Sequence, residues 1–199
     1  MEGPAESKAD PAAAAPLLPV QFGPIHGNNS NMLRALNVAV FPVRYNEKFY
    51  NDVPTLPKEY TMYAWFGEFV VGAICCRRED NTSEDGAARP KKLYIMTLGV
   101  LAAWRGRSIG SRLLEKVLEN AEQDETLDHI YLHVQTNNDA AMSFYANFGF
   151  ENVGMIENYY KRIEPPHCYV LRKSLSGASC SDAPPPADAT LFEDGAKES

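Results

Sequence analysis

A short turn between two regular segments combines glycine with arginine in a way that suits phosphate binding. It reads Arg105-Gly106-Arg107-Ser108-Ile109-Gly110 and lies between an apolar strand pattern and an amphipathic helix pattern. The first N–H groups of a helix have no intrahelical partner, so such a turn presents several donors to an anion. The glycines leave room for a pyrophosphate, and the arginines add positive charge. The residues alone leave a plainer alternative open, a tight connection with two surface arginines.

The composition describes an acidic chain whose charge is concentrated at its ends. The 199 residues carry a formal net charge of -7, and residues 1–20 and 176–199 account for six of these charges. The stretch between them has no basic stripe, which argues against a dedicated nucleic-acid binder. The four cysteines follow neither a disulfide framework nor a zinc spacing, so we expect reduced thiols and no metal site. No apolar run reaches the length of about 20 residues that a membrane span needs.

Length and patterning predict one folded domain between two disordered segments. Residues 1–18 are rich in Pro, Ala and charge, and we interpret them as a disordered leader. They lack the positive region and the long apolar core of a signal peptide. Residues 176–199 contain three consecutive prolines and scattered acids, and are interpreted as a disordered acidic tail. The folded domain then covers residues 19–175.

The hydrophobic periods within this domain predict helices and strands in mixed order. Helices are expected over 28–40 and 109–123, with a third that Asn138 or Asp139 caps and Gly149 ends. Strands are expected over residues 60–65, 69–77, 92–101, 129–135, 150–155 and 169–175, with a polar loop at 78–89. The predicted fold class is α+β (mixed α/β), with one twisted mixed sheet flanked by helices.

The order of these segments resembles the GCN5-related N-acetyltransferase (GNAT) superfamily. The turn, its helix, a second strand, Asn138 and the ending Phe-Tyr-x-x-Phe-Gly-Phe at 144–150 follow one another as in that superfamily. The resemblance implies acetyl-CoA as cosubstrate, with its pyrophosphate on a turn that reads Arg/Gln-x-x-Gly-x-Gly/Ala. Arg105 and Gly110 match this pattern, whereas Ser108 stands where glycine is usual. The acetyl-CoA-binding residues implied are Leu98, Val100, Arg105, Gly106, Arg107, Ser108, Ile109, Gly110, Ser111, Asn138 and Tyr145.

Four further blocks resemble, within that superfamily, the catalytic subunits of NatE-type (San-type) protein N-terminal acetyltransferases. The blocks and the turn span about residues 25–175, and the blocks lie at 41–46, 93–99, 131–135 and 158–163. The resemblance implies acetyl transfer to the α-amine of Met-initiated peptides with a hydrophobic second residue. It makes Tyr94 and His133 the catalytic base pair, acting through an ordered water. Histidine, with a reference pKa near ~6.5, is a more natural proton acceptor than tyrosine near ~10.

The same resemblance implies a mostly apolar slot with an aromatic rim for the peptide. Such a slot suits a methionine side chain, which is flexible and polarizable. The peptide-binding residues implied are Phe41, Pro42, Val43, Tyr45, Met96, Tyr159, Tyr160 and Ile163. The backbone N–H of Leu98 is expected to stabilise the oxyanion, and Tyr145 is expected near the sulfur of coenzyme A.

Two other functions stay open on the sequence alone. One is a lysine or small-amine acetyltransferase on the same fold, since a fold does not fix a function. The other is a weakly active scaffold subunit, for which Ser108 is the best sequence feature. The partners expected are nascent or mature protein N-termini, and the resemblance adds the NatA complex at the ribosome. The expected location is the cytoplasm, with or without a nuclear fraction.

Overall fold

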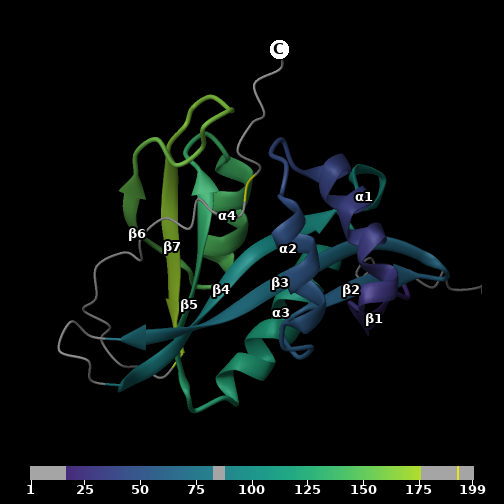
Figure 1. Cartoon of the computed structure of the whole chain (residues 1–199), viewed down its shortest axis with the longest axis horizontal. Coiled ribbons are helices and arrows are strands. Elements are labelled where there is room, and N and C mark those ends of the chain that lie inside the picture. Colours follow the sequence, from purple (N-terminus) through teal and green to yellow (C-terminus); the bar gives the residue numbers. More distant parts are fainter. Residues whose placement is uncertain (1–16, 83–87, 176–191, 193–199) are drawn as a thin grey trace, which may run out of the picture.

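The structure is a computed structural model that describes residues 17–82, 88–175 and 192 (Figure 1). Its strands are β1 (Gln21–Pro24), β2 (Met62–Phe66), β3 (Phe69–Thr82), β4 (Ala88–Val100), β5 (Leu127–Gln135), β6 (Glu151–Ile156) and β7 (Cys168–Ser174). Its α-helices are α1 (Ser30–Val40), α2 (Glu47–Asp52), α3 (Ile109–Glu122) and α4 (Asp139–Asn147). Short 3-10 turns cover Gly27–Asn29, Val53–Thr55 and Ala102–Trp104.

The seven strands form one mixed sheet in the order β1-β2-β3-β4-β5-β7-β6. All neighbours are antiparallel except β4 and β5, which run parallel. A parallel pair needs a crossover connection, and α3 provides it here. The predicted fold class, a mixed sheet flanked by helices, is therefore confirmed.

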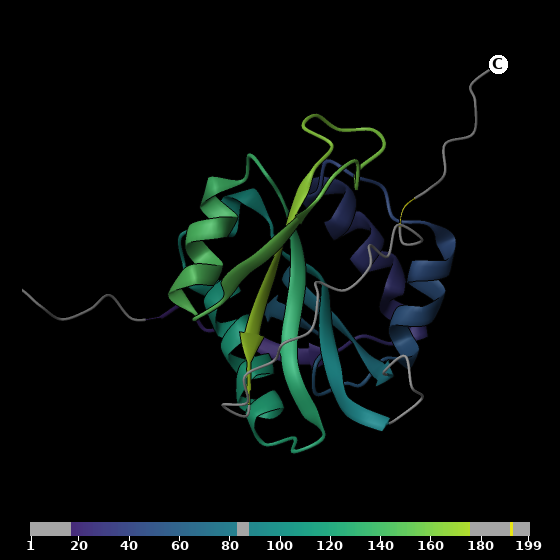
Figure 2. The same cartoon turned by 90° about the vertical axis from the view of Figure 1, so that its left-hand side faces the viewer.

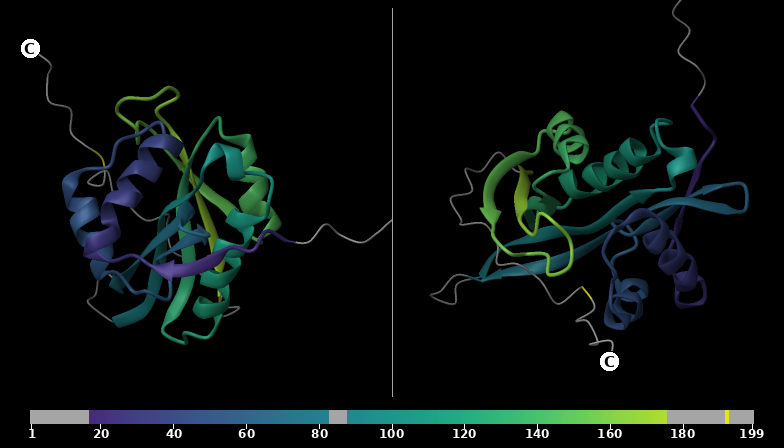
Figure 3. Two further views of the ribbon diagram at one scale, coloured as in Figure 1. Left: turned by 90° about the vertical axis from the view of Figure 1, so that its right-hand side faces the viewer. Right: turned by 90° about the horizontal axis from the view of Figure 1, so that it is seen from above.

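Helices cover both faces of the sheet. Helices α1 and α2 lie on one face, and α3 and α4 lie on the other (Figures 2 and 3). Helix α3 buries the stripe that its sequence predicts: Ile109, Leu113, Leu114, Val117, Leu118 and Ala121. Ile130 and Leu132 of β5 join this cluster, whereas Tyr131 belongs to a second cluster that includes Leu33 and Leu36 of α1. The alternation along β5 thus separates two cores.

The divergence of β4 from β5 creates the space for a site. Their parallel pairing ends at Tyr94 and Tyr131, although both strands continue beyond these residues. Met96 is an extra residue in β4, opposite the step from Cys75 to Cys76 in β3. A bulge of this kind bends a strand and increases its twist. The two strands therefore separate, and their edges face a gap between them.

The arms of the β3–β4 hairpin are longer than the sequence predicts. A polar loop was expected at 78–89, but both strands extend into that range. Ion pairs across the strands hold the polar arms together. Glu79 lies 3.8 Å from Lys92, and Asp80 lies 3.0 Å from Lys91. Because these strand residues are polar on both faces, no apolar alternation marks them.

Two elements, β1 and α2, had no prediction. Helix α2 has only six residues, and Asn46 caps it by accepting a hydrogen bond from the N–H of Phe49 at 2.9 Å. Phe49 and Tyr50 are its buried residues. Strand β1 has four residues at the edge of the sheet. Both elements are too short to show a recognisable period.

The two segments predicted to be disordered lie largely outside the described residues. Leu18, at the end of the predicted leader, packs against the core, and its carbonyl accepts a hydrogen bond from Arg112 at 2.8 Å. Phe192, inside the predicted tail, forms a β-bridge with Tyr45. Both apolar side chains pack on the domain.

Candidate active site

The predicted phosphate turn joins β4 to α3 and has a backbone that permits close approach of an anion. Gly106 and Ser108 both have positive φ, 71° and 58° respectively, and Ser108 is the N-cap of α3. The Nε of Arg105 donates to the carbonyl of Val100 at 3.1 Å, which fixes the turn to the end of β4. The side chain of Ile109 is buried in the core, so only its backbone remains for a ligand.

The other predicted residues of the turn gather at the same place. The guanidinium carbon of Arg107, an exposed residue, lies 5.8 Å from the ring centroid of Trp104. Gly110 lies beside β4, since a Cβ added there would be 3.7 Å from Val100. Ser111 is partly exposed in the first turn of α3. The turn therefore presents positive charge and helix N–H groups at one end of the gap between β4 and β5.

A pocket of about 160 Å³ opens where β4 and β5 diverge. Its wall contains every predicted peptide-binding residue, both predicted catalytic residues and three of the predicted acetyl-CoA-binding residues. These are Phe41, Pro42, Val43, Tyr45, Met96, Tyr159, Tyr160 and Ile163, then Tyr94 and His133, then Leu98, Asn138 and Tyr145. Val100 and the residues of the phosphate turn lie outside this wall.

The predicted peptide slot is built by two segments that are far apart in the sequence. The segment after α1 supplies Phe41 and Tyr45, whose ring centroids are 5.8 Å apart. The loop between β6 and β7 supplies Tyr159 and Tyr160, whose centroids are 4.8 Å apart. Gly99 of β4 lets the first segment pack closely, since a Cβ there would lie 3.1 Å from the ring of Phe41. The slot is thus lined by aromatic rings from both segments, of which Tyr45 and Tyr159 are buried.

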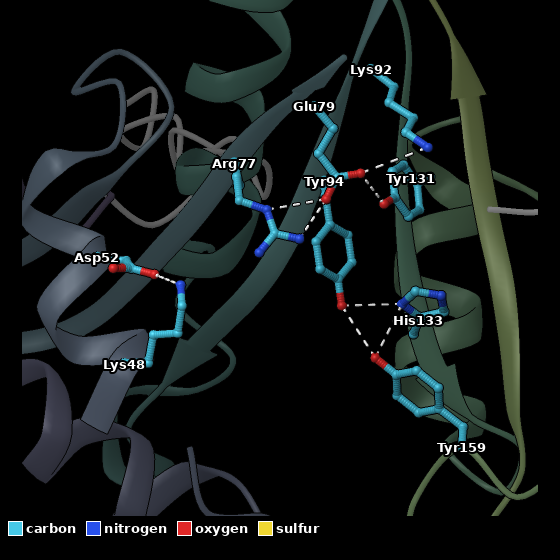
Figure 4. A network of polar contacts seen from close by, with 9 residues as sticks. All are labelled: Lys48, Asp52, Arg77, Glu79, Lys92, Tyr94, Tyr131, His133 and Tyr159. Atoms are coloured by element: carbon cyan, nitrogen blue, oxygen red, sulfur yellow. Dashed lines mark hydrogen bonds and ion pairs between the residues drawn. The ribbon is translucent and has the colours of Figure 1, made fainter. Parts of the chain in front are cut away.

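Three side chains meet at the inner end of the slot (Figure 4). The hydroxyl of Tyr94 lies 3.1 Å from Nδ1 of His133. The hydroxyl of Tyr159 lies 3.4 Å from the same nitrogen and 3.4 Å from the hydroxyl of Tyr94. The rings of His133 and Tyr159 stack at 4.7 Å. The structure therefore brings together the two residues predicted to be catalytic, with a predicted peptide-binding tyrosine as the third member.

The environment of Tyr94 favours its neutral phenol. Burial, the neighbouring Tyr159 hydroxyl and a hydrogen bond to it raise the pKa of Tyr94 well above its ordinary value of 10. Tyr94 therefore keeps its proton at neutral pH, and its hydroxyl lies within hydrogen-bond distance of Nδ1 of His133. The imidazole is the group of this trio that can accept a proton in the physiological range. The arrangement suits a histidine base oriented by a tyrosine.

Helix α4 forms the opposite wall of the pocket. Asn138 is its N-cap, because its side-chain oxygen accepts a hydrogen bond from the N–H of Ala141 at 3.1 Å. Of the two caps predicted, the structure thus selects Asn138. Tyr145 is buried, and burial raises its pKa above the ordinary value. The hydroxyl of Tyr145 is therefore a neutral donor on this wall.

The strand segment after the bulge lines the pocket along β4. Met96 is the bulged residue, and Leu98 follows it two positions later. Leu98 pairs with Ile74 of β3. The role of the Leu98 N–H as oxyanion donor stays a prediction.

The sequence reasoning missed several residues of the pocket wall. Those on strands and α4 are neighbours of predicted residues: Ile95, Thr97, Leu132, Val134, Gln135 and Ala141. Phe192 is different, since its ring lies 5.5 Å from Tyr45, 5.9 Å from Tyr159 and 5.7 Å from Tyr160, centroid to centroid. Its only sequence signal is an apolar pair with Leu191 inside an acidic tail.

Residues 17–82, 88–175 and 192 contain no group of three or more His, Cys, Asp or Glu side chains placed to hold a metal ion. None of their helices has the length and apolar character to cross a membrane. Cys75, Cys76 and Cys168 are free and buried. Burial raises the pKa of Cys75 to about 12, so this thiol is not poised as a nucleophile.

Comparisons with known proteins agree with this geometry. Residues 30–150 match the acetyltransferase (GNAT) family. N-alpha-acetyltransferase 50 of Danio rerio is 45% identical over 168 residues, which are 84% of this chain and 94% of that protein. The probable N-acetyltransferase san of Drosophila melanogaster is 46% identical over 156 residues, 78% of this chain and 81% of that protein.

A solved structure gives the same result. Arabidopsis thaliana Naa50, in complex with the bisubstrate analogue CoA-Ac-MVNAL, is 46% identical with a TM-score of 0.69. The match covers 78% of this chain and 98% of that one. Arabidopsis thaliana NAA60 has a TM-score of 0.69 at 22% identity and shares the fold. The chain belongs to the GNAT acetyltransferase family.

Proposed function

We propose that this chain transfers the acetyl group of acetyl-CoA to the α-amine of peptides that begin with Met followed by a hydrophobic residue. The observation that carries the proposal is one shared pocket, in which the peptide slot opens directly on the Tyr94–His133 pair. The Arabidopsis relative was solved with CoA-Ac-MVNAL, whose peptide begins with Met and Val. That ligand joins the two substrates in the manner that this pocket requires.

The slot explains the proposed preference for methionine. Phe41, Pro42, Val43 and Ile163 supply apolar surface, which suits an unbranched and polarizable thioether side chain. The tyrosines that line the slot have hydroxyls that can hold the peptide backbone. An internal lysine would have to bring its flanking chain into this slot, whereas a free N-terminus needs only its first residues inside.

The trio at the inner end of the slot handles the proton of the amine. A free α-amine has a pKa of about 8 and must lose a proton before it attacks. His133 accepts that proton, directly or through a water, while Tyr94 orients its ring. The amine nitrogen then bonds to the thioester carbonyl carbon and the carbon–sulfur bond breaks. The nitrogen loses a second proton in this step, as the leaving thiolate takes one up. We assign the N–H of Leu98 to the oxyanion and the hydroxyl of Tyr145 to protonation of the leaving sulfur.

The phosphate turn fits the other end of acetyl-CoA. Gly106 and Ser108 turn the chain with positive φ, and the N-terminus of α3 follows at once. Arg105 and Arg107 add charge beside these N–H groups. We therefore assign the pyrophosphate to this turn and the pantetheine arm to the gap between β4 and β5, where Asn138 lines the wall.

The test is acetylation of matched peptides by the purified protein. Peptides beginning Met-Leu and Met-Asp, and an α-blocked peptide with one internal lysine, are incubated with acetyl-CoA and followed by mass spectrometry. We expect one acetyl group on the α-amine of the Met-Leu peptide, and much slower reaction of the other two. Fast reaction of the blocked peptide would favour a lysine acetyltransferase instead. No acetylation of any peptide, with acetyl-CoA bound, would favour a scaffold subunit.

We also propose that the chain acts in the cytoplasm as the catalytic subunit of a NatE-type assembly, with a NatA-type complex at the ribosome. Support comes from the relationship to N-alpha-acetyltransferase 50 and san, and from the substrate, since a new N-terminus first appears at the ribosome. The chain carrying an affinity tag is purified from cells of its own source and its partners are identified. Recovery without NatA subunits or ribosomal proteins, from an active preparation, would contradict the assembly.

A further inference from the structure

A cluster of four polar residues lies beside the catalytic trio on the same face of the sheet (Figure 4). The carboxylate of Glu79 is at its centre. It accepts hydrogen bonds from the hydroxyl of Tyr131 at 2.5 Å and from Nη2 of Arg77 at 2.5 Å, and Lys92 lies 3.8 Å away. The side chain of Glu79 is only 18% exposed. We call these residues, Arg77, Glu79, Lys92 and Tyr131, the Glu79 cluster.

Two members of the Glu79 cluster flank the ring of Tyr94. The ring of Tyr131 stacks on Tyr94, with centroids 4.8 Å apart and an interplanar angle of 18°. The guanidinium carbon of Arg77 lies 5.6 Å from the centroid of Tyr94. Strand register explains this, since Arg77 and Tyr131 are the direct neighbours of Tyr94 on β3 and β5. One carboxylate therefore holds both neighbours of the Tyr94 ring.

This arrangement matters because the Tyr94 hydroxyl must stay at a fixed place. It lies 3.1 Å from the nitrogen of His133, and it sits where β5 leaves β4. Beyond this point the strand pairing no longer fixes the distance between the two side chains. A misplacement of about 1 Å can lower a rate by about 100-fold, even when its cause lies away from the reacting atoms.

We propose that Glu79 is a positioning residue for the reaction, and that Tyr131 transmits its effect to Tyr94. Glu79 anchors the Tyr131 hydroxyl, the anchored Tyr131 ring fixes the plane of Tyr94, and Tyr94 orients His133. Neither Glu79 nor Tyr131 lines the pocket, so neither touches the peptide or acetyl-CoA. The inference rests on the proposed function, because it assigns a role in that reaction.

The experiment compares Glu79→Ala, Tyr131→Phe and the double variant with the wild-type enzyme. Each single variant is expected to lower kcat by about three- to tenfold, with the KM for peptide and the Kd for acetyl-CoA unchanged. The double variant should lose no more than the larger single effect, because both changes break the same connection. Asp80→Ala is the matched control, since Asp80 follows Glu79 on β3 and pairs with Lys91 at the exposed surface.

The outcomes separate this inference from the proposed function. A wild-type enzyme that acetylates no peptide contradicts the function. An active wild type whose Tyr131→Phe variant keeps full kcat contradicts the inference, and so do single effects that add. Tyr131→Phe removes one hydroxyl and keeps the stacked ring, so it tests the proposal even if Glu79→Ala fails to fold. A loss of peptide affinity without a loss of kcat would also overturn it.

Discussion

At the scale of single residues, His133 accepts the proton of the amine and Tyr94 orients its imidazole. Burial keeps Tyr94 protonated, so raising the pH through the neutral range leaves its hydrogen bond to His133 intact. We expect His133→Ala to lower kcat by about 100-fold or more, the usual range for a lost acid–base group, and Tyr94→Phe to lower kcat as well. Steady-state kinetics with saturating acetyl-CoA checks this.

Arg105→Ala should instead raise the KM for acetyl-CoA with kcat largely kept. If the two catalytic variants lose only acetyl-CoA affinity, this division of roles is wrong.

Ser108 has a conformation that glycine adopts more easily. Its φ of 58° is left-handed, which costs a residue with a Cβ roughly 1–2 kcal/mol. This explains physically why the family pattern has glycine at this place. We expect Ser108→Gly to raise the free energy of unfolding by about 0.5–1 kcal/mol, after allowing for the greater flexibility of glycine in the unfolded chain.

The control for this change is Ser111→Gly, which removes the same side chain from the first turn of α3, where the backbone is helical. Glycine is unfavourable in a helix, so the free energy of unfolding should fall there, by about 0.5 kcal/mol. Urea denaturation of both variants measures whether the free energy of unfolding rises in Ser108→Gly and falls in Ser111→Gly. Equal changes in both would show that the left-handed turn stores no strain.

At the scale of elements, Asp124 fastens the end of α3 to the sheet. It accepts hydrogen bonds from the hydroxyls of Tyr60 at 3.0 Å and Thr126 at 2.6 Å, and it forms an ion pair with Arg78 of β3. Burial alone would raise the pKa of Asp124, but the bonds from Thr126 and Tyr60, together with Arg78, lower it below its ordinary 3.8. The ionised carboxylate is thus the form that the folded state prefers.

A carboxyl group with a lowered pKa stabilises the folded state above pH 3.8 and loses this contribution as the pH falls through its folded value. Asp124→Asn should lower the free energy of unfolding by about 1–2 kcal/mol at pH 7. The difference in the free energy of unfolding between Asp124→Asn and wild type should shrink at pH 3 and below. Urea denaturation of both proteins at pH 7 and pH 3 tests this prediction. Asp52→Asn, at an exposed pair with Lys48, should change little at either pH.

The predictability of the fold follows from element length and pattern. Helix α3 could be predicted because its 14 residues repeat an apolar stripe several times. The polar arms of β3 and β4 could not, because ion pairs such as Glu79–Lys92 stabilise them and no apolar period marks them. For the site, Tyr94 and His133 are 39 residues apart, and nothing local indicates that they meet. The family resemblance supplied that pairing, while the Glu79 cluster required the register of three strands.

At the scale of the whole molecule, one residue near the C-terminus reaches the peptide slot. The ring of Phe192 packs among Tyr45, Tyr159 and Tyr160, and a β-bridge joins its backbone to Tyr45. The remaining pocket of about 160 Å³ is smaller than the roughly 300 Å³ at which ligand pockets usually begin. Phe192 lines this pocket, so we expect its ring to compete with a peptide side chain for the space.

We expect Phe192→Ala to lower the KM for peptide by about two- to tenfold, because the substrate no longer displaces an internal competitor. The value of kcat should change little, since the aromatic contacts of Phe192 are with Tyr45, Tyr159 and Tyr160 of the slot. Peptide titrations at saturating acetyl-CoA measure this. Phe69→Ala is the control, because that phenylalanine is 72% exposed and lies outside the pocket wall. A raised KM in Phe192→Ala would mean that the ring is part of the binding wall.

The divergence of β4 and β5 has a consequence for the dynamics of the sheet. Beyond Tyr94 and Tyr131, each strand keeps a neighbour on one side only, so its amides on the other side can exchange with solvent. An extended ligand in the gap would shield both edges at once. Acetyl-CoA should therefore slow deuterium uptake at residues 95–98 and 132–135 more than in the fully paired part of β3. The strand edges that β4 and β5 leave unpaired are then covered while acetyl-CoA is bound and uncovered after coenzyme A leaves.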